Sequence, residues 1–220
     1  MTIIYQVDIE NVEALLRAVQ RNFDKINETL FMRREPLEDF IVENMLAGYE
    51  YVNYLLRKRI NPLRRAEVEH LLELNHIVLC GTDPKMREDY SKHIEATIER
   101  FYSQKTFSIK HIRKWHDNHK KDTPWKRAAG VYILGISVPQ LFWEGNHRTG
   151  ALLMSHIMVS DSKPPFVLTV DNAKGYFNPS TLAKMTKKGS VKSMFKLPKI
   201  KKNFAKFLQA QGNPELISEL

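Results

Sequence analysis

Residues 138–151 read VPQLFWEGNHRTGA, and they lead directly into the apolar run 151–154, which is typical of a buried helix. The predicted helix start carries a carboxylate, a glycine, an amide and a guanidinium, from Glu144, Gly145, Asn146 and Arg148. The first turn of a helix has free N–H groups and the positive end of the helix dipole, and both attract anions. The segment therefore predicts a site for a phosphate group or a nucleotide.

This segment resembles the sequence motif of the Fic (Fido) family, HxFx[D/E]GN[G/K]RxxR. Five positions match in the same order, namely Phe142, Glu144, Gly145, Asn146 and Arg148. Three positions depart from the motif: Gln140 replaces the family's histidine, His147 its glycine or lysine, and Ala151 its second arginine. A looser resemblance extends over about residues 36–188.

The resemblance implies a mainly α fold, a single Fic-type helical bundle with a small β-hairpin flap. Residues 1–35 would form an N-terminal helix packed on the domain, residues 36–188 the Fic-like core, and residues 189–220 a basic C-terminal helical extension. Apolar residues spaced three and four apart, together with capping residues, predict helices independently. These helices cover about 12–30, 36–56, 63–80, 108–119, 124–137, 148–160, 179–186 and 198–211.

Two segments are less helical in pattern. Residues 92–107 partly alternate between polar and apolar side chains, which favours a strand or a short hairpin at the place of the family's flap. Residues 166–170 follow two prolines and are expected to be extended.

Fic proteins transfer AMP from ATP to a Ser, Thr or Tyr hydroxyl of a target protein, and some members move other phosphate-containing groups. The resemblance therefore implies ATP or a related nucleotide as ligand, Mg²⁺ as cofactor and a target protein as partner. Glu144 is the candidate Mg²⁺ ligand, because this ion prefers carboxylate and phosphate oxygens. Its alternative role is a favourable negative charge at a helix N-terminus.

The other matching residues have nucleotide-binding roles with structural alternatives. Gly145 would let the backbone approach a phosphate, or would serve only as a turn glycine. Asn146 would bind the α-phosphate, or would cap the helix. Arg148 would hold phosphate oxygens with two parallel hydrogen bonds, or would form a surface ion pair.

The departures weaken the expected catalysis. General-base assistance contributes about 10²–10⁴-fold, and the amide of Gln140 has no useful basicity near neutral pH. Ala151 also removes a second contact to phosphate. We therefore expect nucleotide binding with weak, altered or absent transfer. The alternative is an active transferase that uses another donor or base; His147 is the candidate substitute base, because a helix N-terminus favours neutral imidazole. Its side chain would otherwise fill the pocket.

Glu43 is a candidate regulatory residue. Many Fic proteins carry an inhibitory helix marked [S/T]xxxE[G/N], whose glutamate pairs with the second arginine of the motif. Here Glu43 and Asn44 match, while Asp39 replaces the hydroxyl residue and Ala151 replaces the arginine. Glu43 would then pair with Arg148 instead, or it faces solvent.

Charge is concentrated near the C-terminus. Residues 184–220 contain nine lysines against Glu215 and Glu219, and so contribute +7 of the net charge of +9. These lysines indicate a solvated surface that serves solubility, or a second alternative, a non-catalytic interaction protein that binds an acidic partner or, less favoured, nucleic acid. The single cysteine excludes an intrachain disulfide, and no run approaches the ~18–20 apolar residues of a membrane span. With no secretory signal, we expect a cytoplasmic protein without a membrane partner.

Overall fold

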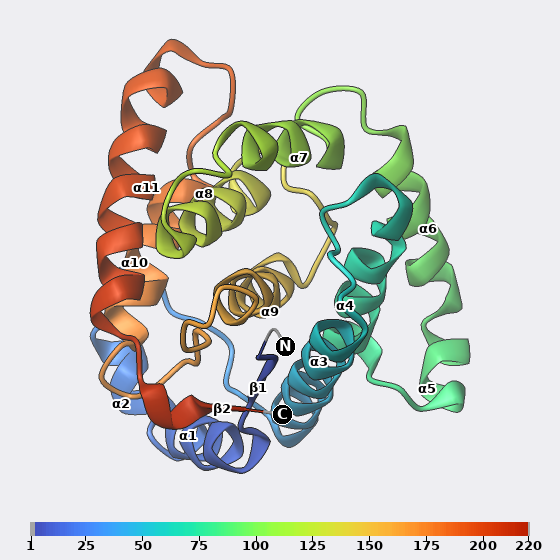
Figure 1. The fold of residues 1–220 in the computed structure, drawn as a ribbon, viewed down its shortest axis with the longest axis vertical. Coiled ribbons are helices and arrows are strands. Elements are labelled where there is room, and N and C mark those ends of the chain that lie inside the picture. Colours follow the sequence, from blue (N-terminus) through green and yellow to red (C-terminus); the bar gives the residue numbers. More distant parts are fainter. Residues whose placement is uncertain (1–2, 220) are drawn as a thin grey trace.

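Helix α9 (Asn146–Val159) lies at the centre of the molecule in the computed structural model, which describes residues 3–219 (Figure 1). Most of its side chains are buried, including the polar side chains of Asn146, Thr149, Ser155 and His156. It packs against α3 (Asp39–Lys58), α4 (Glu69–Cys80) and α8 (Pro124–Ile136). The segment that contains the motif therefore begins the central helix of the core.

The remaining helices surround this centre. Helix α11 (Val191–Ala210) and helix α7 (Ile109–Asn118) both pack against α8 (Figure 1). The other elements are α1 (Ile9–Arg21), α2 (Phe23–Glu28), a 3-10 turn at Arg65–Glu67, α5 (Pro84–Asp89), α6 (Ser91–Ser103), α10 (Ala173–Lys184) and a 3-10 turn at Pro214–Leu216. The prediction of a mainly α fold is confirmed, and most predicted helices lie within a few residues of their observed positions.

A two-stranded antiparallel sheet joins sequence-distant ends of the described chain. Strand β1 (Tyr5–Val7) pairs with β2 (Ile217–Glu219), with Tyr5 opposite Glu219 and Val7 opposite Ile217. The buried side chain of Asn53 on α3 accepts a hydrogen bond from the Val7 N–H (2.7 Å) and donates one to its carbonyl (2.9 Å). The sheet is thus attached to the helical core by one amide.

The predicted strand or hairpin at residues 92–107 is wrong, because the structure places α6 there. Thr97 and Phe101 are buried one helical turn apart, and the Phe101 ring stacks on that of Phe142 (5.5 Å between centroids). Burial on one helix face decides the conformation, since the polar and apolar alternation was short and incomplete. In residues 3–219 the sheet of β1 and β2 is the only one, so the expected β-hairpin flap is absent there.

Two helix starts predicted at prolines are also wrong. Helix α10 begins at Ala173 and continues through Pro179, and α11 begins at Val191 and continues through Pro198. A proline removes one backbone N–H and is disfavoured inside a helix, so sequence reasoning placed the boundary at the proline. Ser190 caps α11 instead, accepting a hydrogen bond from the Ser193 N–H at 3.2 Å. The predicted extended segment 166–170 is neither strand nor helix, and Phe166 and Val167 are buried.

Candidate functional site

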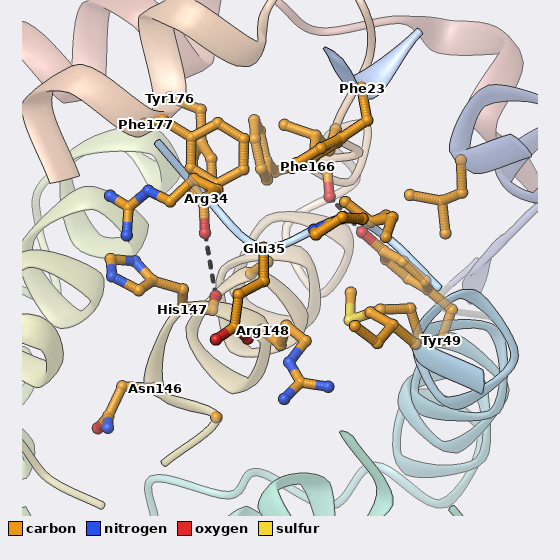
Figure 2. A pocket seen from close by; sticks show the side chains of 18 residues that line it. Phe23, Arg34, Glu35, Tyr49, Asn146, His147, Arg148, Phe166, Tyr176 and Phe177 are labelled. Atoms are coloured by element: carbon orange, nitrogen blue, oxygen red, sulfur yellow. Dashed lines mark hydrogen bonds between the residues drawn. The ribbon is translucent and has the colours of Figure 1, made fainter. Parts of the chain in front are cut away.

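A pocket of about 290 Å³ lies beside the first turn of α9 (Figure 2). Its walls come from α1, α2, the segment 34–37, α3, the start of α9 and residues 166–177. Aromatic side chains make up much of its lining, namely Phe23, Tyr49, Phe166, Tyr176 and Phe177. The pocket is therefore mainly apolar, and a few charged groups stand in its wall.

Four of the sequence-predicted site residues line this pocket, namely Gly145, Asn146, His147 and Arg148. They begin α9, whose N-terminal cap residue, Gly145, provides no side-chain hydrogen bond to the first turn. An N-terminus without a side-chain cap leaves backbone N–H groups available to an anion.

Gly145 is required by packing as well as by its backbone conformation. Its φ angle is +71°, a region that residues with a side chain rarely adopt. A Cβ at this position would lie 2.8 Å from Nδ2 of Asn75 on α4. That same amide donates hydrogen bonds to the Glu144 carbonyl and to the Thr149 hydroxyl, both at 3.0 Å. The glycine therefore lets the loop lie against α4.

Asn146 holds the motif loop together. Its side-chain oxygen accepts a hydrogen bond from the Phe142 N–H, and its side-chain NH₂ donates to the Phe142 carbonyl, both at 2.9 Å. The Asn146 side chain is buried, and the predicted contact to an α-phosphate would compete with these two bonds. In this conformation Asn146 supports the loop.

Arg148 is the predicted residue best placed to bind an anion. Its guanidinium donates one hydrogen bond to the Val78 carbonyl of α4. Within residues 3–219 no carboxylate lies at ion-pair distance from it. Burial lowers the pKa of Arg148, and the nearby carboxylates of Glu144 and Glu35 oppose that shift. Because an arginine remains charged in proteins, the pocket wall carries a positive charge without an ion pair.

A second guanidinium, that of Arg34, stands in the same pocket. It donates to the Thr181 hydroxyl at 2.7 Å and lies 5.3 Å from the centre of the Phe177 ring. Its Nε is buried and has no hydrogen-bond partner, and no carboxylate of the described chain forms an ion pair with it. Figure 2 shows Arg34 and Glu35 on the segment that crosses the pocket, while Arg148 comes from α9.

Sequence reasoning missed Arg34 because it belongs to an irregular segment with no motif. The only local signal was the position of the Arg33-Arg34-Glu35 run directly before Pro36. A proline biases the residue before it towards extended backbone, which is compatible with a segment that spans a pocket. That signal does not say which part of the fold the segment crosses.

The His147 side chain is turned towards α8. Its Nδ1 is hydrogen-bonded to the Tyr132 hydroxyl (2.9 Å), and its carbonyl accepts a hydrogen bond from the Tyr176 hydroxyl (3.0 Å). Its Nε2 is buried and has no hydrogen-bond partner among the described residues. Burial, assisted by the positive charges of Arg34 and Lys184, lowers the pKa of His147 to about 3. The imidazole is therefore neutral at pH 7, and its low basicity argues against a strong general base.

The other predicted site residues lie outside the pocket lining. The Gln140 side chain donates back to the Ile136 carbonyl of α8 at 3.2 Å. Glu144 is exposed, and within residues 3–219 no group of three or more His, Cys, Asp and Glu side chains is arranged to hold a metal ion. Glu43 forms an ion pair with Arg17 on α1, and 59% of its side chain is exposed. The structure therefore does not bring Glu43 to Arg148.

No protein-family model matches this chain, and no curated protein is significantly similar to it. Within the described residues no helix is both long and apolar enough to cross a membrane.

Proposed function

We propose that this protein is Fic-like and binds a nucleotide or a related phosphate ligand in the pocket at the start of α9, with weak, altered or absent AMP transfer. The observation that carries the proposal is the pair of guanidinium groups, Arg34 and Arg148, in the lining of one pocket. That lining also contains the Glu35 carboxylate, but within residues 3–219 no carboxylate lies at ion-pair distance from either arginine. Guanidinium groups bind phosphate oxygens with fixed geometry, and hydrogen bonds to charged groups are the strong ones.

The apolar part of the pocket supports a ligand with an aromatic portion. Tyr49, Phe166, Tyr176 and Phe177 surround the space beside the two arginines. Aromatic side chains favour offset stacking and edge contacts with other rings, as a nucleotide base would offer. Mg²⁺, when bound with the phosphates, would supply positive charge. Glu144, the one motif carboxylate, is exposed and lies outside the lining of this pocket, so phosphate and water oxygens would have to provide most of the coordination.

Weak transfer follows from the groups near the motif loop. Gln140 has an amide at the position of the family's base, and this amide is bonded to α8. The pKa of His147, about 3, leaves it a poor proton acceptor. Attack by a hydroxyl of a target protein needs a group that accepts its proton, and neither residue meets that need.

Calorimetric titration with ATP and Mg²⁺ tests the binding site. Arg148→Ala and Arg34→Ala should each weaken binding about tenfold or more, because a hydrogen bond to a charged group contributes about 1.5–3 kcal/mol. Arg33→Ala is the matched control, since Arg33 is exposed and does not line the pocket. Equal affinity in the wild type and both pocket variants, or no binding heat in any protein, would refute the proposal.

Transfer is tested separately with labelled ATP and cell lysate. The wild type should label proteins weakly or not at all, and Gln140→His should increase labelling if the altered base limits the rate. Strong wild-type labelling that disappears in His147→Ala would instead favour the active-transferase alternative.

A further inference from the structure

The first turns of α11 expose an apolar surface on the side opposite the core. Val191, Met194 and Phe195 are 75%, 69% and 77% exposed. Their spacing of three and four residues places them on one side of the helix. The buried side of the same helix carries Leu197, Ile200, Phe204 and Leu208. We call Val191, Met194 and Phe195 the α11 outer face.

Lysines are frequent in the part of the chain that contains this face, and acids are absent from it. No Asp or Glu occurs between Asp171 and Glu215, while ten lysines do. Two of them are turned inwards, Lys188 to the Leu134 carbonyl (2.8 Å) and Lys201 over the Trp115 ring. Along the described chain none of the ten forms an ion pair. The α11 outer face is therefore apolar and belongs to a segment that carries only positive charges.

The position of this face suits a broad surface. The start of α11 and the connection before it lie at the outer edge of the molecule, at the top of the view in Figure 1. A protruding helix end with apolar side chains can contact a broad, flat surface, whereas a protein partner would need a groove that encloses it. Nucleic acid fits less well, because the segment between Asp171 and Glu215 has no arginine and Phe195 is the only ring on the outer face for base stacking.

We propose that the α11 outer face docks on an anionic lipid bilayer, with its apolar side chains inserted among the headgroups and the lysines, including Lys192 and Lys199, against the lipid charges. Helices with an apolar face and lysines around it bind in the plane of the bilayer, and each lysine near the surface adds attraction to anionic lipid. Such a helix lies on the membrane, so the proposal is independent of the absence of a spanning helix in residues 3–219. It is also independent of the pocket and its ligand.

Co-sedimentation with vesicles tests this proposal. The full chain should pellet with phosphatidylcholine vesicles that contain phosphatidylserine, should pellet much less with pure phosphatidylcholine, and should be released as salt increases. The triple variant Val191→Ala/Met194→Ala/Phe195→Ala should bind the anionic vesicles at least tenfold more weakly. Lys192→Glu/Lys199→Glu should also weaken binding, through charge alone.

Tyr102→Ala is the matched control, because Tyr102 is a 59% exposed aromatic residue on a different helix, α6. It should bind vesicles like the wild type, and circular dichroism should show the same helix content in all variants. The proposal is overturned if the wild type does not pellet with anionic vesicles at low salt, or if the triple variant binds them as well as the wild type. Binding of an RNA or an acidic peptide that depends on the outer face, without vesicle binding, would also overturn it.

Discussion

At the residue scale, Gly145 combines two constraints that oppose any side chain. The backbone has φ of +71°, and Nδ2 of Asn75 lies only 2.8 Å from the place that a Cβ would take. Asn75 cannot move away freely, since it also bonds the Glu144 carbonyl and the Thr149 hydroxyl. This glycine therefore fixes the path of the motif loop into α9.

Gly145→Ala should destabilise the protein by about 1–3 kcal/mol, because a left-handed non-glycine residue is strained and the methyl group displaces Asn75. Chemical denaturation would measure the loss as a lower midpoint concentration, with an unchanged dependence of the free energy of unfolding on denaturant. Gly135→Ala in α8 is the control. Apart from its chain neighbours and its own helix backbone, no atom of the described residues lies within 4 Å of the place that its new methyl group would take, so it should be neutral or stabilising by up to about 1 kcal/mol. Similar losses for both variants would contradict this account.

His147 should make stability depend on pH. Its pKa is about 6.5 in the unfolded chain and about 3 in the fold, so the unfolded state binds more protons between these values. The free energy of unfolding should therefore fall as pH decreases from about 6.5 towards 3. The buried His156, with a pKa of about 4, contributes in the same direction.

Thermal denaturation at pH 7 and pH 5 tests this behaviour. The wild type should have a lower melting temperature at pH 5 than at pH 7. In His147→Gln this decrease should be smaller, because the variant has no buried imidazole that must stay neutral; each kcal/mol of difference corresponds to about 2–4 °C. His111→Gln, at an exposed position on α7, should follow the wild type. A His147→Gln variant with the same pH dependence as the wild type would show that this imidazole is not the cause.

The chemistry of single residues was only partly predictable. The motif loop could be located, because its residues are contiguous and precede an apolar helix. The sequence does not show that Asn146 bonds Phe142, because that depends on how the loop turns. It also does not show that Arg34 joins the pocket, because no local pattern reports which irregular segment crosses a distant helix.

At the element scale, helices with a clear apolar face were predictable, and elements decided by distant contacts were not. Helix α3 was predictable because its buried residues, from Val42 to Leu56, recur at the spacing of one helix face. The region of α6 was predicted as a strand or a short hairpin, because the contact between Phe101 and Phe142 that favours burial of one face is long-range. Strands β1 and β2 were not predicted, because three-residue strands have little periodicity and their pairing joins opposite ends of the sequence.

Asn53→Ala should destabilise the protein by about 2 kcal/mol or more. The variant leaves the buried Val7 N–H and carbonyl without their partner, and each unsatisfied backbone group costs about 1–3 kcal/mol. Denaturation in urea would measure this loss, and Asn203→Ala, at an exposed position on α11, should change stability by less than about 0.5 kcal/mol. Equal stability of the two variants would mean that water satisfies Val7.

At the scale of the whole molecule, the described parts should unfold together. Val12, Leu152 and Leu208 come from the predicted N-terminal, core and C-terminal parts, yet they belong to one apolar cluster. We expect coincident urea transitions when helix content is followed by circular dichroism and local structure by a fluorophore on α11. A C-terminal transition at clearly lower urea would show instead that α11 is a separate unit.

The antiparallel pairing of β1 and β2 has a consequence for connectivity. Paired residues in such a ladder have Cα atoms roughly 4.5–5.5 Å apart, so Tyr5 and Glu219 are close enough to be joined by a short linker. The chain could then be opened elsewhere, for example in the exposed turn at Lys120-Lys121 between α7 and α8, without separating the helices that form the pocket. The helices could therefore be connected in a different order along the chain and still place Arg34 beside α9.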